Sequence, residues 1–229
     1  MPDRRRGRRG RLTGPVLAAA LAALPAAAVA ESGGLFGTGG FEDVEPGERV
    51  VFRHERSGDA RLPAITGGEA VILLAEAEAD GARELRVSLI SGGRTLPVPP
   101  MPAEAANPIL LIFLENTVRH MAELTGGSPF YIRNRMREAL WLAGGPGEAV
   151  TIETEGGTVD GQRVAIRPFA EDPNRAAMGA FAELRISFVL SDAVPGGIAR
   201  LDARAGGGAS GAAALLESFS YSGIDREER

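Results

Sequence analysis

The sequence predicts an α+β fold, in which a helical hairpin is inserted into a curved antiparallel β-sheet (a meander) and packs on its concave face. Short runs of alternating apolar and polar residues, typical of half-buried strands, occur on both sides of residues 107–143. Residues 107–143 instead carry two sets of helix-capping signals. The turns between the runs are short and rich in glycine pairs, which favours antiparallel neighbours over parallel strands with helical crossovers.

The alternating runs give a set of expected strands in chain order. In the first run Val50, Phe52 and His54 share one face. In the last run one face carries Glu217 together with Leu215, Phe219 and Tyr221. The Pro-rich run 97–102 is expected to be a stiff connector, because proline fits neither a helix interior nor a central strand. Strands are expected at 48–56, 70–75, 85–89, 95–98, 150–152, 164–166 and 184–190, near residue 201, and at 215–221.

The helical hairpin is predicted from its ends. The pairs Asn107-Pro108 and Ser128-Pro129 each combine a good N-cap with a proline suited to the first helical position. The pairs Gly126-Gly127 and Gly144-Gly145 are suited to the left-handed conformation that ends many helices. Two consecutive helices are therefore expected within residues 107–143.

The N-terminus is typical of a secretory signal peptide. Six arginines precede residue 12, an apolar run follows, and Ala28-Val29-Ala30 matches the small-residue cleavage pattern. Cleavage is predicted between Ala30 and Glu31, leaving a periplasmic or secreted protein without a transmembrane anchor. The expected organisation is a signal peptide at 1–30, a flexible leader at 31–47, a single domain at 48–224 and a charged tail at 225–229.

Composition excludes several classes of function. Removing residues 1–30, which hold six arginines and one aspartate, changes the formal net charge from −5 to −10, so binding to nucleic acid is not expected. The chain has no lysine, which excludes Schiff-base chemistry, and no cysteine, which excludes disulfides, thiol nucleophiles and thiolate metal sites. No cofactor is implied.

The hairpin holds the candidate ligand-binding residues. Its first helix begins with six consecutive apolar residues, Ile109–Leu114, and an element that is apolar all round is either buried on several sides or covers a groove. Aromatic residues and the only tryptophan also fall here. The hypothetical ligand-binding residues are Ile109, Phe113, Leu114, Val118, Phe130, Tyr131 and Trp141, with core packing as the alternative.

Charged residues of the hairpin suggest a second kind of contact. Arg133 and Arg137 are four apart and share a helix face, a basic patch suited to an anion or an acidic partner, with ordinary ion pairing as the alternative. Glu115, Arg119 and Glu123 are spaced for an exposed ion-pair ladder. His120 and Glu123 alone are too few ligands for a metal site, so no metal is expected, and no catalytic residue is singled out.

The order of parts resembles the periplasmic lipoprotein-localisation carriers, the resemblance being carried by the hairpin Asn107–Leu142 between opening strands and a closing meander. In that superfamily a curved sheet wraps around helices and encloses an apolar cavity for acyl chains. Asn107–Arg137 and Arg167–Asn174 also resemble an uncharacterised bacterial exported family. The resemblance implies a lipid or other apolar ligand.

The leading hypothesis is a non-enzymatic periplasmic protein that binds an apolar or amphipathic ligand between hairpin and sheet. An envelope assembly or scaffold protein that uses the hairpin as a protein-interaction surface is the alternative. An envelope hydrolase ranks third, because no pair of acidic residues is singled out for general acid–base catalysis.

Overall fold

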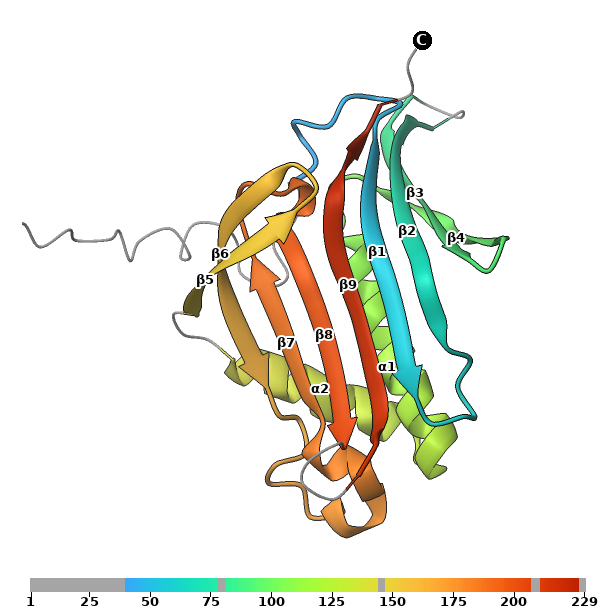
Figure 1. Cartoon of the computed structure of the whole chain (residues 1–229), viewed down its shortest axis with the longest axis vertical. Coiled ribbons are helices and arrows are strands. Elements are labelled where there is room, and N and C mark those ends of the chain that lie inside the picture. The colour runs from blue at the N-terminus through green and yellow to red at the C-terminus, as the bar shows by residue number, and fades with distance from the viewer. Residues whose placement is uncertain (1–39, 78–80, 144–146, 207–210, 227–229) are drawn as a thin grey trace, which may run out of the picture.

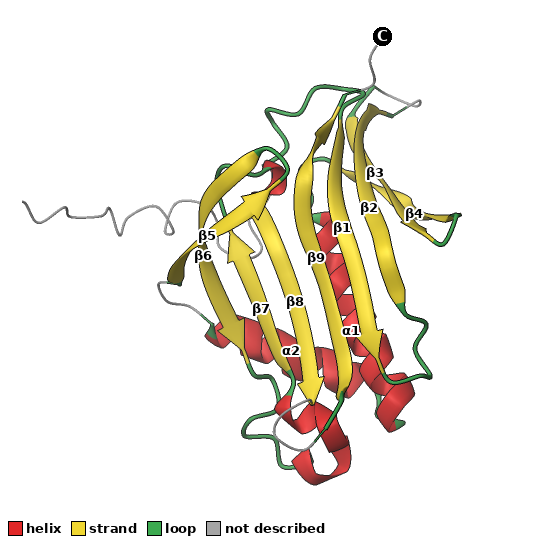
Figure 2. Cartoon of the chain, viewed as in Figure 1, coloured by secondary structure: helices red, strands yellow, loops and turns green. Residues whose placement is uncertain are grey.

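The computed structural model describes residues 40–77, 81–143, 147–206 and 211–226, and these form one nine-stranded antiparallel sheet with helices on one face (Figures 1 and 2). The predicted combination of an antiparallel sheet and helices is confirmed. The predicted signal peptide, the predicted cleavage site and most of the predicted leader lie outside the described residues. The strands are β1 Arg49–Gly58, β2 Ile65–Glu76, β3 Arg83–Ser91, β4 Arg94–Pro102, β5 Glu148–Thr154, β6 Gly157–Ile166, β7 Arg185–Leu190, β8 Ile198–Gly206 and β9 Ala213–Asp225.

The sheet consists of two meanders joined by the first and last strands. Its strand order is β4-β3-β2-β1-β9-β8-β7-β6-β5, so β9 lies in the interior, between β1 and β8. The β1–β9 pair runs from Arg49 opposite Asp225 to Gly58 opposite Leu215. This long-range pairing holds the two halves of the molecule together, and local alternation in the sequence does not reveal it.

The Pro-rich run 97–102 forms part of a strand, which corrects the expectation of a connector. It lies in β4, which pairs with β3 on one side only and ends the sheet. Proline lacks the amide hydrogen that a second neighbour would need, so an edge strand is the one place in a sheet where such a run fits.

The helical hairpin consists of α1 Pro108–Thr125 and α2 Pro129–Leu142, which confirms the expected helices. The side chain of Asn107 accepts a hydrogen bond from the amide of Ile109 at 2.9 Å, and Gly126 ends α1 with φ of 71°. Ser128 caps α2 in the same way. The second expected stop, Gly144-Gly145, lies outside the described residues.

The start of α1 is buried against the sheet. Ile109, Leu110 and Phe113 are 0% exposed. The ring of Phe113 makes edge-to-face contacts with Phe188 of β7 and Phe219 of β9, at centroid distances of 6.5 and 6.2 Å. The junction between hairpin and sheet is therefore filled by side chains at this point.

At the other end of the sheet, the β5–β6 hairpin bends over the face that the helices leave free. Residues 157–161 of β6 pair only with β5, residues 162 and 163 pair with both β5 and β7, and residues 164–166 pair only with β7. The bend falls at Gly161, where an added Cβ would lie 2.5 Å from the carbonyl oxygen of Leu190. The hydroxyl of Ser191 donates to the carbonyl of Asp160 at 2.6 Å and holds the bend. The strand expected at 164–166 therefore begins earlier than predicted, because β6 starts at Gly157 and runs through the bend.

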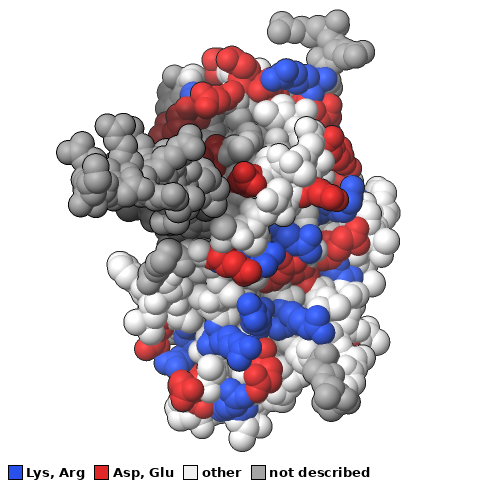
Figure 3. Space-filling view, turned by 60° about the vertical axis from the view of Figure 1, so that its left-hand side comes forward, with Lys and Arg blue, Asp and Glu red and all other residues white. Residues whose placement is uncertain are grey.

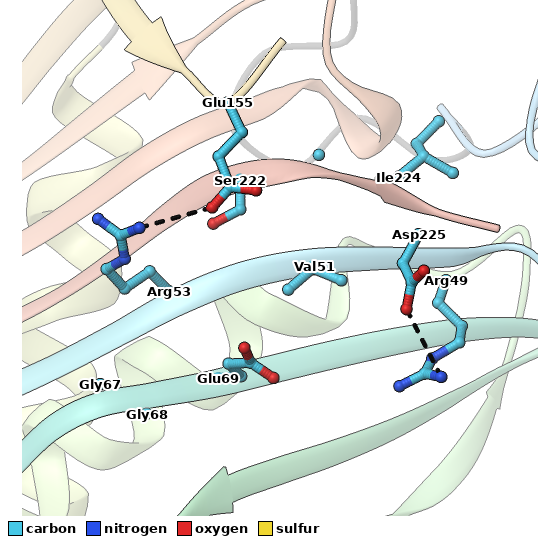
Figure 4. Close-up of a pocket in the computed structure, with 11 residues that line it drawn as sticks. Arg49, Val51, Arg53, Gly67, Gly68, Glu69, Glu155, Ser222, Ile224 and Asp225 are labelled. Carbon is cyan, nitrogen blue, oxygen red and sulfur yellow. Dashed lines mark ion pairs between the residues drawn. The ribbon is translucent and has the colours of Figure 1, made fainter. Parts of the chain in front are cut away.

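The tip of the bent hairpin reaches the centre of the sheet (Figure 4). The amide of Glu155 donates to the carbonyl of Ser222 in β9 at 3.2 Å, and its carboxylate lies 3.5 Å from the guanidinium of Arg53 in β1. Both side chains of this ion pair are largely exposed, so it contributes little to stability.

We expect the substitution Gly161→Ala to destabilise the fold by about 1–3 kcal/mol, because the new methyl group would collide with backbone at the bend. Urea unfolding measures the effect. Gly156→Ala is the matched control, since its nearest neighbour would be 3.9 Å away. Equal stability of the two variants would contradict the role given to Gly161.

Candidate functional site: the outward face of the hairpin

The outward face of α2 carries two large exposed aromatic side chains. Phe130 is 76% exposed and Trp141 is 82% exposed. They are eleven residues apart, close to three full turns, so they lie on the same face with about 16 Å of helix axis between them. Ile132, Met136 and Leu140 occupy the opposite face and pack into the core. We call the set Phe130, Asn134, Arg137 and Trp141 the outward face of α2.

Arg137 lies between the two rings. Its guanidinium donates to the side-chain oxygen of Asn134 at 3.0 Å. Among the described residues no carboxylate forms an ion pair with it, so its charge is available to a binding partner. Arg133, the other predicted basic residue, pairs with Glu115 of α1 at 2.9 Å and lies 5.8 Å from the centroid of the Phe130 ring.

The pairing of Glu115 with Arg133 corrects the expected ion-pair ladder along α1. Arg119 donates instead to the side chain of Asn116 at 2.7 Å. The ladder was predicted from spacing within one helix, whereas Glu115 finds its cation on the neighbouring helix.

A buried aspartate fixes α2 to the rest of the fold. Asp172 accepts hydrogen bonds from the hydroxyl of Tyr131 at 2.8 Å and from Nε of Arg135 at 2.9 Å. It also accepts from the amide of Asn174 at 2.8 Å, which is the Asx turn expected for this residue type. Burial alone would raise the pKa of Asp172, but these hydrogen bonds and the charge of Arg135 lower it below its usual value. The carboxylate is thus ionised and holds two α2 side chains.

A cavity of about 430 Å³ lies at the turn of the hairpin. Its apolar walls include Met121 of α1, Ile132 of α2 and Met178, which belongs to the 3₁₀ segment Arg175–Glu183. Tyr131 and Asn174 add polar groups at its rim. The volume is within the range of small-molecule sites.

The structure separates the seven predicted ligand-binding residues into three places. Ile109, Phe113 and Val118 are in the hydrophobic core, with Leu114 packed against it. Phe130 and Trp141 are on the outward face of α2, and Tyr131 lines the cavity at the hairpin turn. A ligand beneath Ile109 and Phe113 would have to displace fully buried side chains.

A buried charged cluster lies between α1 and the sheet, and the sequence reasoning missed it. The side chain of Glu217 in β9 is 0% exposed. Its Oε1 is 2.9 Å from Nε2 of His54 in β1, and its Oε2 is 3.1 Å from Nδ1 of His120 in α1. Asn116 of α1 donates to the same carboxylate at 3.3 Å. One carboxylate of β9 therefore contacts side chains of both β1 and α1.

Arg56 completes this cluster. Its Nη1 donates to Nε2 of His120 at 3.0 Å, which assigns the proton of a neutral His120 ring to Nδ1, facing Glu217. The Nδ1 contact is close but poorly aligned for a hydrogen bond, so its attraction is mainly electrostatic. Burial alone would raise the pKa of Glu217, but the close contacts of its carboxylate with His120 and His54 lower it to about 2.

The signal for this cluster was present in the sequence. Glu217 is on the same strand face as apolar residues that face the core. His54 likewise shares a face with Val50 and Phe52. A lone acid on an apolar face implies a buried partner. What the sequence could not show is that β1 and β9 are neighbours and that His120 lies above them.

The cluster lacks the features of an active site. His54 and His120 are 3% and 5% exposed, so substrate has little access to either ring. In the described ranges, no group of three or more histidine, aspartate or glutamate side chains is arranged to hold a metal ion. The arrangement suits a structural role, in which a paired charge joins helix and sheet.

No family model matches the chain, and no curated protein matches it. Among solved structures, the chain is similar to a proposed exported protein with a YmcC-like fold from Bacteroides fragilis. The similarity has 9% identity and a TM-score of 0.33, and covers 80% of this chain and 97% of that one. Within the described residues, no helix is long and apolar enough to cross a membrane.

We expect the stability of the fold to decrease as pH falls from about 4.5 towards 2, in part because Glu217 is ionised in the folded state and protonates more readily when unfolded. A folded pKa of about 2 against 4.5 unfolded means that the stabilisation is complete above pH 4.5 and is lost as pH falls through the folded pKa. The contribution is at most about 3 kcal/mol.

Urea unfolding of wild type and Glu217→Gln between pH 3 and 7 tests this expectation. The variant should be less stable at pH 7 and should lose less stability on acidification. Glu115→Gln, which removes a half-exposed carboxylate, is the control and should follow the wild-type profile. An unchanged pH profile in Glu217→Gln would contradict the assigned role.

Proposed function

We propose that this chain is an exported, non-enzymatic binding protein that docks onto a protein partner through the outward face of α2. The observation that carries the proposal is the exposure of Phe130 and Trp141 on one helix face, with Arg137 between them. Export is inferred from the first thirty residues alone.

The residue types on this face are those that dominate protein interfaces. Tryptophan and arginine are enriched among the residues that contribute most to binding, and exposed aromatic groups gain free energy when a partner buries them. The partner that fits has apolar hollows for the two rings and a carboxylate opposite Arg137.

The anchoring of α2 supports the same function. Arg133 binds Glu115, and Tyr131 and Arg135 both bind Asp172, so contacts on both flanks hold the helix in place. A surface that is already ordered loses little conformational entropy on binding.

A protein partner is favoured over an anionic membrane. The chain without residues 1–30 has a net charge of −10, so its long-range field repels an anionic lipid surface. Glu138 and Glu115 flank the outward face of α2, which further opposes lipid adsorption.

The cavity at the hairpin turn supports a second candidate function, the binding of an apolar or amphipathic small molecule such as a lipid. Two methionines and an isoleucine line it, and methionine adapts to irregular ligands. This candidate retains the leading hypothesis from the sequence but moves the ligand from beneath Phe113 to the turn.

Site-specific photo-crosslinking in the cell, with the crosslinker at position 134, tests the docking proposal. The captured partner is then purified, and its affinity is measured with wild type and variants. We expect Trp141→Ala to weaken binding at least about tenfold, the effect expected of a central interface residue. Leu96→Ala, on the exposed edge strand β4, is the control and should bind as wild type.

Two results would overturn the docking proposal. Equal loss of affinity in Trp141→Ala and Leu96→Ala would show that the outward face of α2 has no special role. Co-sedimentation of the protein with vesicles containing phosphatidylglycerol, abolished by Trp141→Ala, would assign the face to a membrane instead.

Native mass spectrometry of protein purified from the periplasm tests the second candidate. We expect a co-purifying apolar molecule in the wild type that is absent from Ala177→Trp, because an indole at this exposed lining position would fill the cavity. Leu96→Trp is the control for an added surface indole. A ligand-free wild type, or a ligand kept by Ala177→Trp, would contradict binding in this cavity.

A further inference from the structure

The sheet face opposite the helices holds a second cavity, of about 690 Å³. Its lining residues come from β5, β6, β7 and β8. Figure 1 shows the β5–β6 hairpin bent over the neighbouring strands of the sheet. Residues 151–153 of β5 form one wall, and residues of β6, β7 and β8 form the floor. The bend at Gly161 creates the cavity, because a straight β6 would leave this face of the sheet flat.

Arginines from three neighbouring strands line this cavity: Arg163 of β6, Arg185 of β7 and Arg200 of β8. Figure 3 turns the left-hand side of Figure 1 towards the viewer. Basic side chains, with acidic ones between them, are visible on this side. Glu153 and Asp202 are the acidic residues of the lining.

The three arginines differ in how far their charge is already matched. Arg200 makes a two-pronged contact with Asp202, with hydrogen bonds of 2.8 to 3.0 Å, so this charge is matched. Arg163 has only a long contact, 3.5 Å, with the exposed carboxylate of Glu148. Arg185 has no hydrogen-bond or ion-pair partner in the part of the chain that the structure describes.

In the β7–β8 register Arg185 stands opposite Arg204, which has an interaction of its own. The chain has 30 acidic residues, yet none of the described ones neutralises Arg185.

From this arrangement we propose that the cavity under the β5–β6 hairpin binds an organic anion that carries phosphate or carboxylate groups. Arg185 and Arg163 bind the anionic groups, because a guanidinium can donate two parallel hydrogen bonds to either a phosphate or a carboxylate. The hydroxyl of Ser187 is a further donor in the lining, whereas that of Thr151 already donates to Asp160 at 2.9 Å. The volume suits a small organic molecule rather than a single inorganic ion.

This site is independent of the outward face of α2. The helix α2 and the β5–β6 hairpin, which supplies one wall of the cavity, lie on opposite faces of the sheet (Figure 2). The failure of one proposal therefore leaves the other standing.

Titration of the isotope-labelled protein, at constant ionic strength, with inorganic pyrophosphate and separately with citrate tests the proposal by NMR. We expect saturable shifts confined to amides of β5, β7 and β8, and the probe that binds more tightly identifies phosphate or carboxylate as the preferred group. Arg185→Gln should weaken binding at least about fivefold, as expected for the loss of a charge-assisted hydrogen bond. Arg94→Gln, an exposed arginine of β4, is the matched control.

Two outcomes would overturn the proposal. One is the absence of saturation by either probe up to about 10 mM, a concentration that exceeds the dissociation constants of weak specific sites. The other is equal affinity of Arg185→Gln and Arg94→Gln for the probe. That result would show that the probe is attracted to the positive charges of the surface in general and not to this cavity. A folded spectrum of each variant, recorded before titration, excludes unfolding as the cause of lost binding.

Discussion

The fold depends on the pairing of β1 with β9 and on the carboxylate that this pairing buries. Glu217 enters the core from β9, meets His54 of β1 and His120 of α1, and so joins both halves of the sheet and the helical hairpin at one point. Burying a carboxylate is costly unless it is matched on all sides, so the surrounding positions are strongly constrained. Stacking of His54 on Phe219 at 4.0 Å shows how closely the apolar core surrounds the charge. An apolar contact would tolerate small shifts of α1, whereas this cluster requires one position.

The helical hairpin has two sides in different environments. Its inward side, led by Ile109 and Phe113, is packed into the core, whereas its outward side leaves Phe130 and Trp141 in solvent. Because Asp172 and Glu115 hold α2 from both flanks, the exposed rings are on a rigid support. Exposed rings on a rigid support are the feature on which the proposed docking rests.

Local features of the sequence predicted local features of the structure well. The caps at Asn107 and Ser128 predicted both helices, and alternation predicted where the strands lie. The Pro-rich run was placed wrongly, because proline limits a strand to an edge but does not prevent it. The ligand-binding residues were proposed as one group, but the structure separates them, since apolar character does not distinguish Phe113 in the core from Phe130 in solvent. The arginine-lined cavity could not be foreseen, because it depends on how far β6 bends.

The interior position of β9 has a consequence for how the chain reaches its native state. The strand that completes the sheet, β9 at residues 213–225, is the last of the described strands in chain order, so β1 and β8 lack a common neighbour until β9 is in place. Until then each half presents an unpaired strand edge, and the acid that binds both histidines is still missing from the core. The late arrival of so central a strand makes folding slow and non-local. In the exported protein proposed above, such a delay would keep the polypeptide in a form that an export channel can thread.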